Sequence, residues 1–142
     1  MSGQNVEVVR RCYDALNRGD WDAARRAMHP DVELTTQRGP DAGTHRGREA
    51  LERFHKDYIA SFASHVFEPE HLLENGDQVV VLLTRRARLE GSSADIVVRN
   101  GAVWTVQEGK VLSIRSFPDP NGALEAAGLK HWGRPSEPRA RR

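Results

Sequence analysis

Little in this 142-residue sequence points to a protein held together by covalent links or embedded in a membrane. Cys12 is the one cysteine, so the chain can form neither an intrachain disulfide nor a cluster of thiolates around zinc. No stretch approaches about eighteen consecutive apolar residues, and the sequence predicts no membrane-spanning helix. The first residues also lack the basic segment and apolar run of a secretory signal, so we expect a cytoplasmic protein.

Net charge is nearly absent as well. The formal charge is +1, from 21 basic and 20 acidic side chains. Residues 133–142 hold four arginines and one glutamate, so the rest of the chain is slightly acidic. Because nucleic-acid phosphates are bound by basic faces, we expect no nucleic-acid partner. The sequence predicts one folded domain at residues 1–132, followed by a disordered basic tail at 133–142.

Hydrophobic residues make up 38% of the chain, which is enough for a core, and their spacing predicts three helices. Gly19 is expected to end the first helix, and Asp20 to cap the second. Pro30 is expected to end the second helix. The apolar stripes are Val6, Val9, Tyr13 and Leu16 in the first helix and Leu51, Phe54, Tyr58 and Phe62 in the third.

The rest of the chain indicates β structure. Strands are predicted at residues 31–36, 65–74, 78–89, 95–107 and 110–117, with a loop at 37–47 and a short helix at 121–127. Tight turns at 75–77 and 108–109 favour antiparallel neighbours. Helices and strands are segregated along the chain, which predicts an α+β fold. We expect a curved, mixed but mostly antiparallel sheet wrapped around three helices, forming a cone with an apolar interior that suits a small molecule.

Four segments carry a resemblance to a known family: residues 13–21, 29–32, 46–51, and 104–111 leading to 123–129. On these segments the chain resembles the nuclear transport factor 2-like superfamily, and within it the SnoaL-like polyketide cyclase and ketosteroid isomerase-like branch. The resemblance covers about residues 4–130 and implies a cystatin-like α+β barrel. It implies no single activity, because this fold hosts isomerases, cyclases, hydrolases and non-catalytic modules.

The catalytic residues of these relatives can be compared with the residues at the matching positions of this chain. Relatives that isomerise steroid ketones use a carboxylate base and a protonated aspartate, and here Thr36 and Gly101 fall at those positions. Relatives that open limonene epoxide use two aspartates and an arginine. In this chain Arg86 matches the arginine, whereas Ser116 stands in place of the last aspartate. SnoaL-like cyclases use an aspartate for acid–base chemistry. The nearest candidates for that aspartate are Asp95 and Asp119.

The same alignment predicts which side chains line the cone. It turns the even-numbered residues of 78–90 and the odd-numbered residues of 97–105 inward, which places Arg86 opposite Arg99. Two guanidinium groups in an apolar cone need partners, so we expect an anionic ligand there. The alternative is that both arginines form ordinary salt bridges on a solvent-facing surface. The other predicted ligand contacts are Tyr13, Trp21, Tyr58, Thr36 and Ser116.

His55 lies beside the apolar stripe of the third predicted helix and is the histidine best placed to act as a general base, although a surface position is the alternative. The six histidines show no metal-ligand spacing, so we expect no metal and no cofactor. The sheet face away from the cone is predicted to be apolar and to form a homodimer. The residues assigned to that face are Val79, Val81, Leu83, Val98, Ala102, Trp104 and Val106.

Two hypotheses therefore remain open. The chain is either a cofactor-independent isomerase, cyclase or hydrolase that acts on a small hydrophobic ligand with a carbonyl or anionic group, or a non-catalytic binding or dimeric interaction module.

Overall fold

The two N-terminal helices form where the apolar stripes predict them, in a computed structural model that describes residues 3–36 and 43–129. Helix α1, Gln4–Arg18, ends at Gly19, whose φ of 71° lets its N–H bond back to the last turn. Helix α2, Trp21–Ala27, begins after Asp20, whose carboxylate accepts a hydrogen bond from the Ala23 N–H at 3.1 Å.

The segment after α2 differs from the prediction. Helix α2 ends before Pro30, and strand β1, Met28–Thr36, takes the proline into the sheet. The pairing of β1 is irregular between Met28 and Glu33, and an irregular stretch of strand tolerates a residue without an N–H.

A second strand lies inside the predicted loop. Strand β2, Gly43–Arg46, pairs antiparallel with β1, and residues 37–42 lie outside the described ranges. Four residues at a sheet edge are too few for an alternating pattern to stand out in the sequence.

The remaining elements lie close to their predicted positions. They are helix α3 (Arg48–Ala60), strands β3 (Ser64–Asn75), β4 (Gln78–Arg88), β5 (Asp95–Gln107) and β6 (Lys110–Phe117), and helix α4 (Pro120–Ala126). Asp119 caps α4 by accepting a hydrogen bond from the Asn121 N–H at 2.9 Å.

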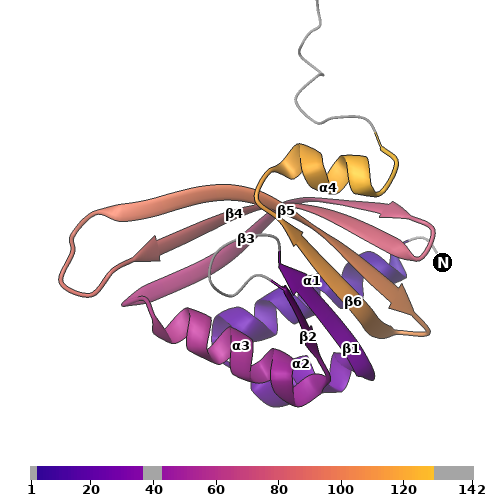
Figure 1. Cartoon of the computed structure of the whole chain (residues 1–142), viewed down its shortest axis with the longest axis horizontal. Coiled ribbons are helices and arrows are strands. Elements are labelled where there is room, and N and C mark those ends of the chain that lie inside the picture. Colours follow the sequence, from indigo (N-terminus) through magenta and orange to yellow (C-terminus); the bar gives the residue numbers. More distant parts are fainter. Residues whose placement is uncertain (1–2, 37–42, 130–142) are drawn as a thin grey trace, which may run out of the picture.

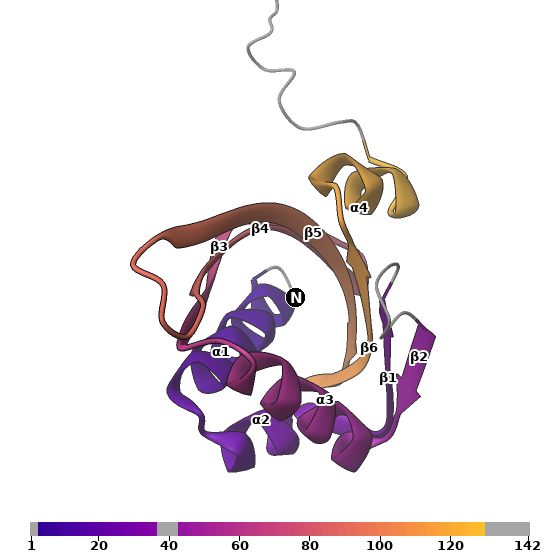
Figure 2. The ribbon, with the colours of Figure 1, turned by 60° about the vertical axis from the view of Figure 1, so that its left-hand side comes forward.

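Six strands form one sheet in the order β2-β1-β6-β5-β4-β3. Strands β1 and β6 are parallel and every other neighbouring pair is antiparallel. The sheet arches over α1, α2 and α3, while α4 lies on the opposite, convex side (Figures 1 and 2). The predicted α+β class and the curved, mostly antiparallel sheet are confirmed, and the sheet does not close into a barrel.

Both faces of the central strands are apolar. On the concave side Leu83 and Trp104 pack against the helices, whereas on the convex side Val80 and Val103 pack against α4. The predicted alternation of β4 and β5 is therefore wrong by one residue. The side chains that were assigned to an outer dimer surface mostly form the helix-facing core. Hydrophobicity could not distinguish the faces, because α4 buries the convex one as well.

Asn17 fixes the distance between α1 and the sheet. Its side-chain amide donates to the carbonyl of Phe67 and accepts from the N–H of Phe67, both at 2.8 Å. This paired contact holds β3 against the helix and places the Phe67 ring beside Tyr13, with 5.6 Å between ring centroids.

The described helices include none long and apolar enough to cross a membrane. The predicted tail at residues 133–142 lies outside the described ranges.

Candidate functional site

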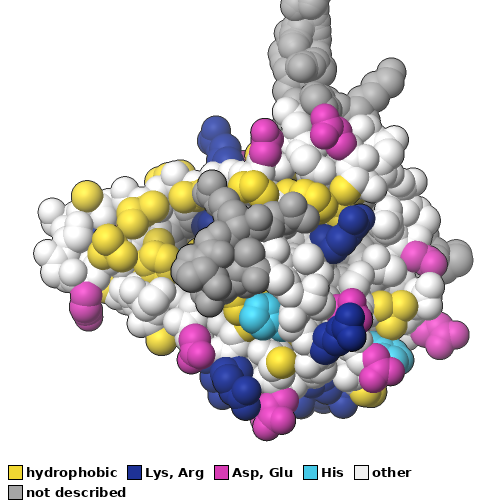
Figure 3. Space-filling view, in the orientation of Figure 1, with side chains coloured by type: hydrophobic (Ala, Val, Ile, Leu, Met, Phe, Trp, Pro, Cys, Tyr) yellow, Lys and Arg dark blue, Asp and Glu magenta, His cyan; other side chains and the backbone are white. Residues whose placement is uncertain are grey.

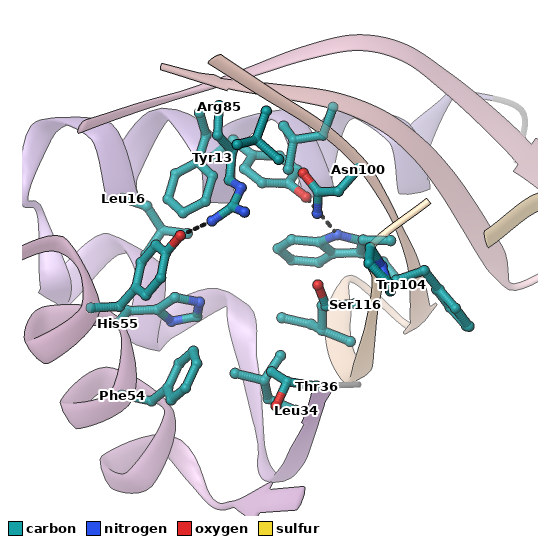
Figure 4. A pocket seen from close by; sticks show the side chains of 18 residues that line it. Tyr13, Leu16, Leu34, Thr36, Phe54, His55, Arg85, Asn100, Trp104 and Ser116 are labelled. Carbon is teal, nitrogen blue, oxygen red and sulfur yellow. Dashed lines mark hydrogen bonds between the residues drawn. The ribbon is translucent and has the colours of Figure 1, made fainter. Parts of the chain in front are cut away.

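A cavity of about 340 Å³ opens between the concave face of the sheet and helices α1 and α3 (Figure 4). Its size lies within the usual range for small-molecule sites. Its walls are mainly apolar and aromatic. The lining residues are Tyr13, Leu16, Leu34, Thr36, Phe54, His55, Tyr58, Phe67, Leu83, Arg85, Val98, Asn100, Ala102, Trp104, Ile114, Ser116, Phe117 and Pro118.

Tyr13 and Trp104 form the inner wall of this cavity. The Trp104 Nε1–H donates to the Tyr13 hydroxyl at 3.1 Å, and the two ring centroids lie 5.0 Å apart. Burial raises the pKa of Tyr13 above its ordinary value, so the phenol stays neutral. The predicted contact Tyr13 is thus at the cavity, where its hydroxyl also satisfies the buried indole N–H.

Arg85 on β4 brings a positive charge into the aromatic cavity. Its Nη1 donates to the hydroxyl of Tyr58 on α3, and its Cζ lies 5.4 Å from the centre of that ring (Figure 4). The Tyr58 hydroxyl accepts this bond, so its own proton remains available to another acceptor. No aspartate or glutamate belongs to the described lining. The described lining therefore offers an entering oxygen the hydrogen-bond donors of Arg85 and Tyr58.

His55 reaches the same cavity one turn before Tyr58 on α3. Burial lowers its pKa to about 4, against a smaller opposing effect from a hydrogen bond with the Leu51 backbone, and His45 and His65 lower it further. The imidazole is consequently neutral at pH 7. A neutral imidazole that gives one N–H to the backbone keeps a second nitrogen that can accept a proton.

Hydroxyl and amide groups come from the strands. Thr36 on β1 and Ser116 on β6 line the cavity as predicted, and Asn100 on β5 lies near Trp104 (Figure 4). Asn100 is only 6% exposed, and its Oδ1 is buried without a hydrogen-bond partner among the described residues. Asn100 is not among the predicted ligand contacts, because the predicted register turned it outward.

The two predicted arginines lie outside the cavity, which corrects their assignment. Arg86 is exposed and its Nε donates to Glu68 at 2.9 Å, while Arg99 is exposed opposite Thr84 on the convex face. The reason is the one-residue shift of β4 and β5, which turns Arg85 inward in place of Arg86. The salt-bridge alternative describes Arg86 correctly.

The two predicted aspartates also lie away from the cavity. Asp95 accepts a hydrogen bond from the Arg88 Nη2 at 2.7 Å, and Asp119 caps α4, so neither lines the cavity. Trp21 lies behind the site, where it lines a hollow of about 20 Å³ together with His55. Within residues 3–36 and 43–129, no group of three or more histidine, cysteine or acidic residues is placed to hold a metal ion.

Comparison with known proteins adds a family and a shared fold. Residues 9–114 match the family model of the SnoaL-like domain. An NTF2-like protein from Burkholderia pseudomallei K96243 has a TM-score of 0.74 and 26% identity, covering 88% of this chain and 97% of its own. No curated protein matches the chain.

Two further solved structures contain small molecules. TerC, co-crystallised with polyporic acid, has a TM-score of 0.74 and 23% identity, covering 89% of this chain and 99% of its own. RV0760c from Mycobacterium tuberculosis, in complex with estradiol-17beta-hemisuccinate, has a TM-score of 0.69 and 17% identity, covering 80% of this chain and 92% of its own. At these identities the likeness shows the fold alone.

Proposed function

This chain belongs to the SnoaL-like domain family, and on that basis we propose that its cavity binds a small, mostly apolar ligand through a carbonyl or anionic oxygen and acts on it by acid–base chemistry without a cofactor. One observation carries the proposal: the Arg85–Tyr58 pair and the neutral His55 open onto the same cavity. The aromatic walls can pack against the apolar part of the ligand, and the Arg85–Tyr58 pair can bind its oxygen.

Arg85 and Tyr58 form the oxygen-binding end. A guanidinium presents several N–H donors in a plane and binds carboxylates or enolates through paired hydrogen bonds. Such bonds are stronger in the lower dielectric of a partly buried cavity than on an exposed surface. Two structural neighbours were crystallised with polyporic acid, an acid by name, and with estradiol-17beta-hemisuccinate, a half-ester that keeps one carboxyl group, and both ligands support this chemistry.

His55 supplies the base. Its free nitrogen takes a proton from a carbon next to the ligand carbonyl, and the electron pair of the broken C–H bond moves toward the carbonyl oxygen. Arg85 and Tyr58 stabilise the negative charge on that oxygen. Return of the proton to another ligand atom restores neutral His55. Proton transfer of this kind is common to isomerisation and cyclisation. With His55 as the base, the reaction needs no aspartate in that role.

Substitution of Arg85 tests the binding proposal. We expect Arg85→Gln to bind estradiol-17beta-hemisuccinate about ten- to a hundredfold more weakly than the wild type, because a charge-assisted hydrogen bond is lost. Arg86→Gln is the matched control, since Arg86 is the next residue of the same strand and lies on the other face. Titration calorimetry measures both affinities. Equal affinities for Arg85→Gln and Arg86→Gln would refute the anion site.

A non-catalytic binding module is the second candidate, favoured by the absence of a carboxylate from the described lining. Exchange of the acidic C–H of 2-tetralone, followed by proton NMR in D2O, separates the two. We expect the wild type to accelerate exchange and His55→Asn to lose at least about a hundredfold of that rate. His71→Asn, at an exposed position of β3, is the control. Binding of 2-tetralone by the wild type without accelerated exchange would identify a binding module.

We still propose a homodimer, but through a different surface. Most of the side chains first predicted to form the interface are buried in the core. Large apolar side chains that are still exposed include Val66 at 42% and Val97 at 49%. They lie on either side of Arg86 in the strand pairing, so Val66, Arg86 and Val97 form one row on the convex face.

A further inference from the structure

We infer that Asn100 forms a second polar subsite, which takes a hydroxyl group of the ligand. This inference rests on the proposed function, because it concerns the same cavity and its bound molecule. It specifies the ligand more closely: an apolar ring system with an acidic or enolate oxygen at one end and a hydroxyl at the other.

The Asn100 side chain is buried with an unsatisfied oxygen. The residue is 6% exposed and lines the cavity, yet its Oδ1 is buried with no hydrogen-bond partner among the described residues. A buried amide oxygen without a partner is unfavourable, and each such group in a native protein calls for an explanation. An apolar side chain of similar size would fill the same space at no such cost.

An amide side chain is best satisfied by a group that can both donate and accept hydrogen bonds. Its oxygen accepts hydrogen bonds and its NH2 group donates them, and the side chain can present either group by turning over. A hydroxyl both donates and accepts, so it pairs with Asn100 in either orientation. A carboxylate only accepts, and the Arg85–Tyr58 pair already provides the stronger place for it.

Asn100 and Arg85 are neighbours on the cavity side of the sheet. Strand pairing places Leu83 opposite Asn100 and Val98 opposite Arg85, so Arg85 and Asn100 are diagonal neighbours on the cavity side of β4 and β5. Diagonal neighbours stand roughly 7–8 Å apart. Figure 4 shows Arg85 on the side of α3, and Asn100 toward Trp104 and Ser116. One rigid ring system can therefore span the two polar ends.

A pair of naphthoic acids tests the subsite. 2-Naphthoic acid and 6-hydroxy-2-naphthoic acid share the carboxylate and differ by one hydroxyl at the far end of the ring. We expect the wild type to bind the hydroxy acid about tenfold more tightly. Asn100→Leu is expected to lose this preference while still binding 2-naphthoic acid. Arg85→Gln is expected to weaken both acids and to keep the preference.

Thr84→Val is the matched control. Thr84 is also buried, at 1% exposed, and its Oγ1 also has no partner among the described residues, but it does not line the cavity. We expect this variant to keep the wild-type preference for the hydroxyl. The Asn100 side-chain amide signals in a 15N–1H spectrum should shift with the hydroxy acid more than with its parent.

The outcomes separate the two levels of the proposal. If the wild type binds both acids equally, or if Asn100→Leu keeps the preference, the hydroxyl subsite is refuted and the proposed function stands. If the wild type binds neither acid, the anion site fails and the subsite fails with it. Loss of the preference in Thr84→Val as well would show an effect of core packing and would overturn the assignment to Asn100.

Discussion

At the scale of single residues, the chemistry of the cavity depends on where one side chain points. Arg85 and Arg86 are adjacent and chemically identical, yet one donates to Tyr58 inside the cavity and the other to Glu68 on the surface. Either register of β4 would turn one of these two arginines toward the cavity. Only the register determines which one, and therefore which substitution affects a ligand.

His55 links the site to the stability of the fold. In the unfolded chain its pKa is near 6.5, and in the folded chain burial lowers it to about 4. Between these values the unfolded chain binds a proton that the folded chain does not, so the free energy of unfolding decreases as the pH falls from 6.5 toward 4. The full effect of this one group is about 3 kcal/mol.

We therefore expect His55→Gln to flatten the dependence of stability on pH over this window, whereas His71→Gln, at an exposed position, retains the wild-type slope. Urea unfolding measured at several pH values between about 4 and 7 provides the comparison. Burial lowers the pKa of His65 as well, so His65 also makes the free energy of unfolding decrease as the pH falls. A wild-type slope in His55→Gln would show that the histidine is not buried as described.

At the scale of elements, helix α4 explains the main error of the sequence analysis. It covers the convex face of β4 and β5, where Val80, Leu82 and Val103 pack against Ala123 and Leu124. A sheet with one wet face shows a clear alternation, but two covered faces give a nearly continuous apolar run. Leu82 and Leu83 are both 4% exposed, so hydrophobicity alone could not assign them to opposite sides.

The approach of α4 to the sheet requires a glycine. A Cβ on Gly101 would lie 2.8 Å from the Cβ of Ala123 and 3.0 Å from the Cα of Pro120. We expect Gly101→Ala to push α4 away and to lower the free energy of unfolding by about 1–3 kcal/mol. Gly122→Ala is the contrasting variant, since a Cβ there meets Phe117 at 3.4 Å and alanine favours the helix. Denaturant unfolding measures the stability of both variants. An unchanged free energy of unfolding in Gly101→Ala would contradict the close packing of α4.

At the scale of the whole molecule, the described residues form one curved sheet, with α1–α3 on its concave side and α4 on its convex side (Figures 1 and 2). Apolar side chains also gather at the surface where β4 and β5 project beyond the helices (Figure 3). Leu89, at 46% exposed, and Ile96, at 37%, belong to this end of the two strands.

The homodimer is tested at this scale. With a chain mass of 15.9 kDa, two copies give about 32 kDa by doubling, and we expect light scattering after size exclusion to report that mass. A mass of one chain across the concentration range would exclude the dimer.

Local patterns along the chain are enough to predict most of the elements and the fold class. Apolar spacing and turn residues identify the main helices and strands, and the resemblance to the SnoaL-like branch is confirmed by the family match over residues 9–114. Tyr13, Thr36, His55, Tyr58 and Ser116 were placed at the cavity correctly, because their positions follow from helix faces and from strands whose register was right.

The polar chemistry of the cavity, in contrast, depends on how distant elements pack together. The inward positions of Arg85 and Asn100 depend on which face of β4 and β5 meets the helices, and that choice depends on α4, which packs on the other face. Strand alternation has a period of two, so it fixes a pattern but not its direction. Contacts between elements distant in the sequence set that direction.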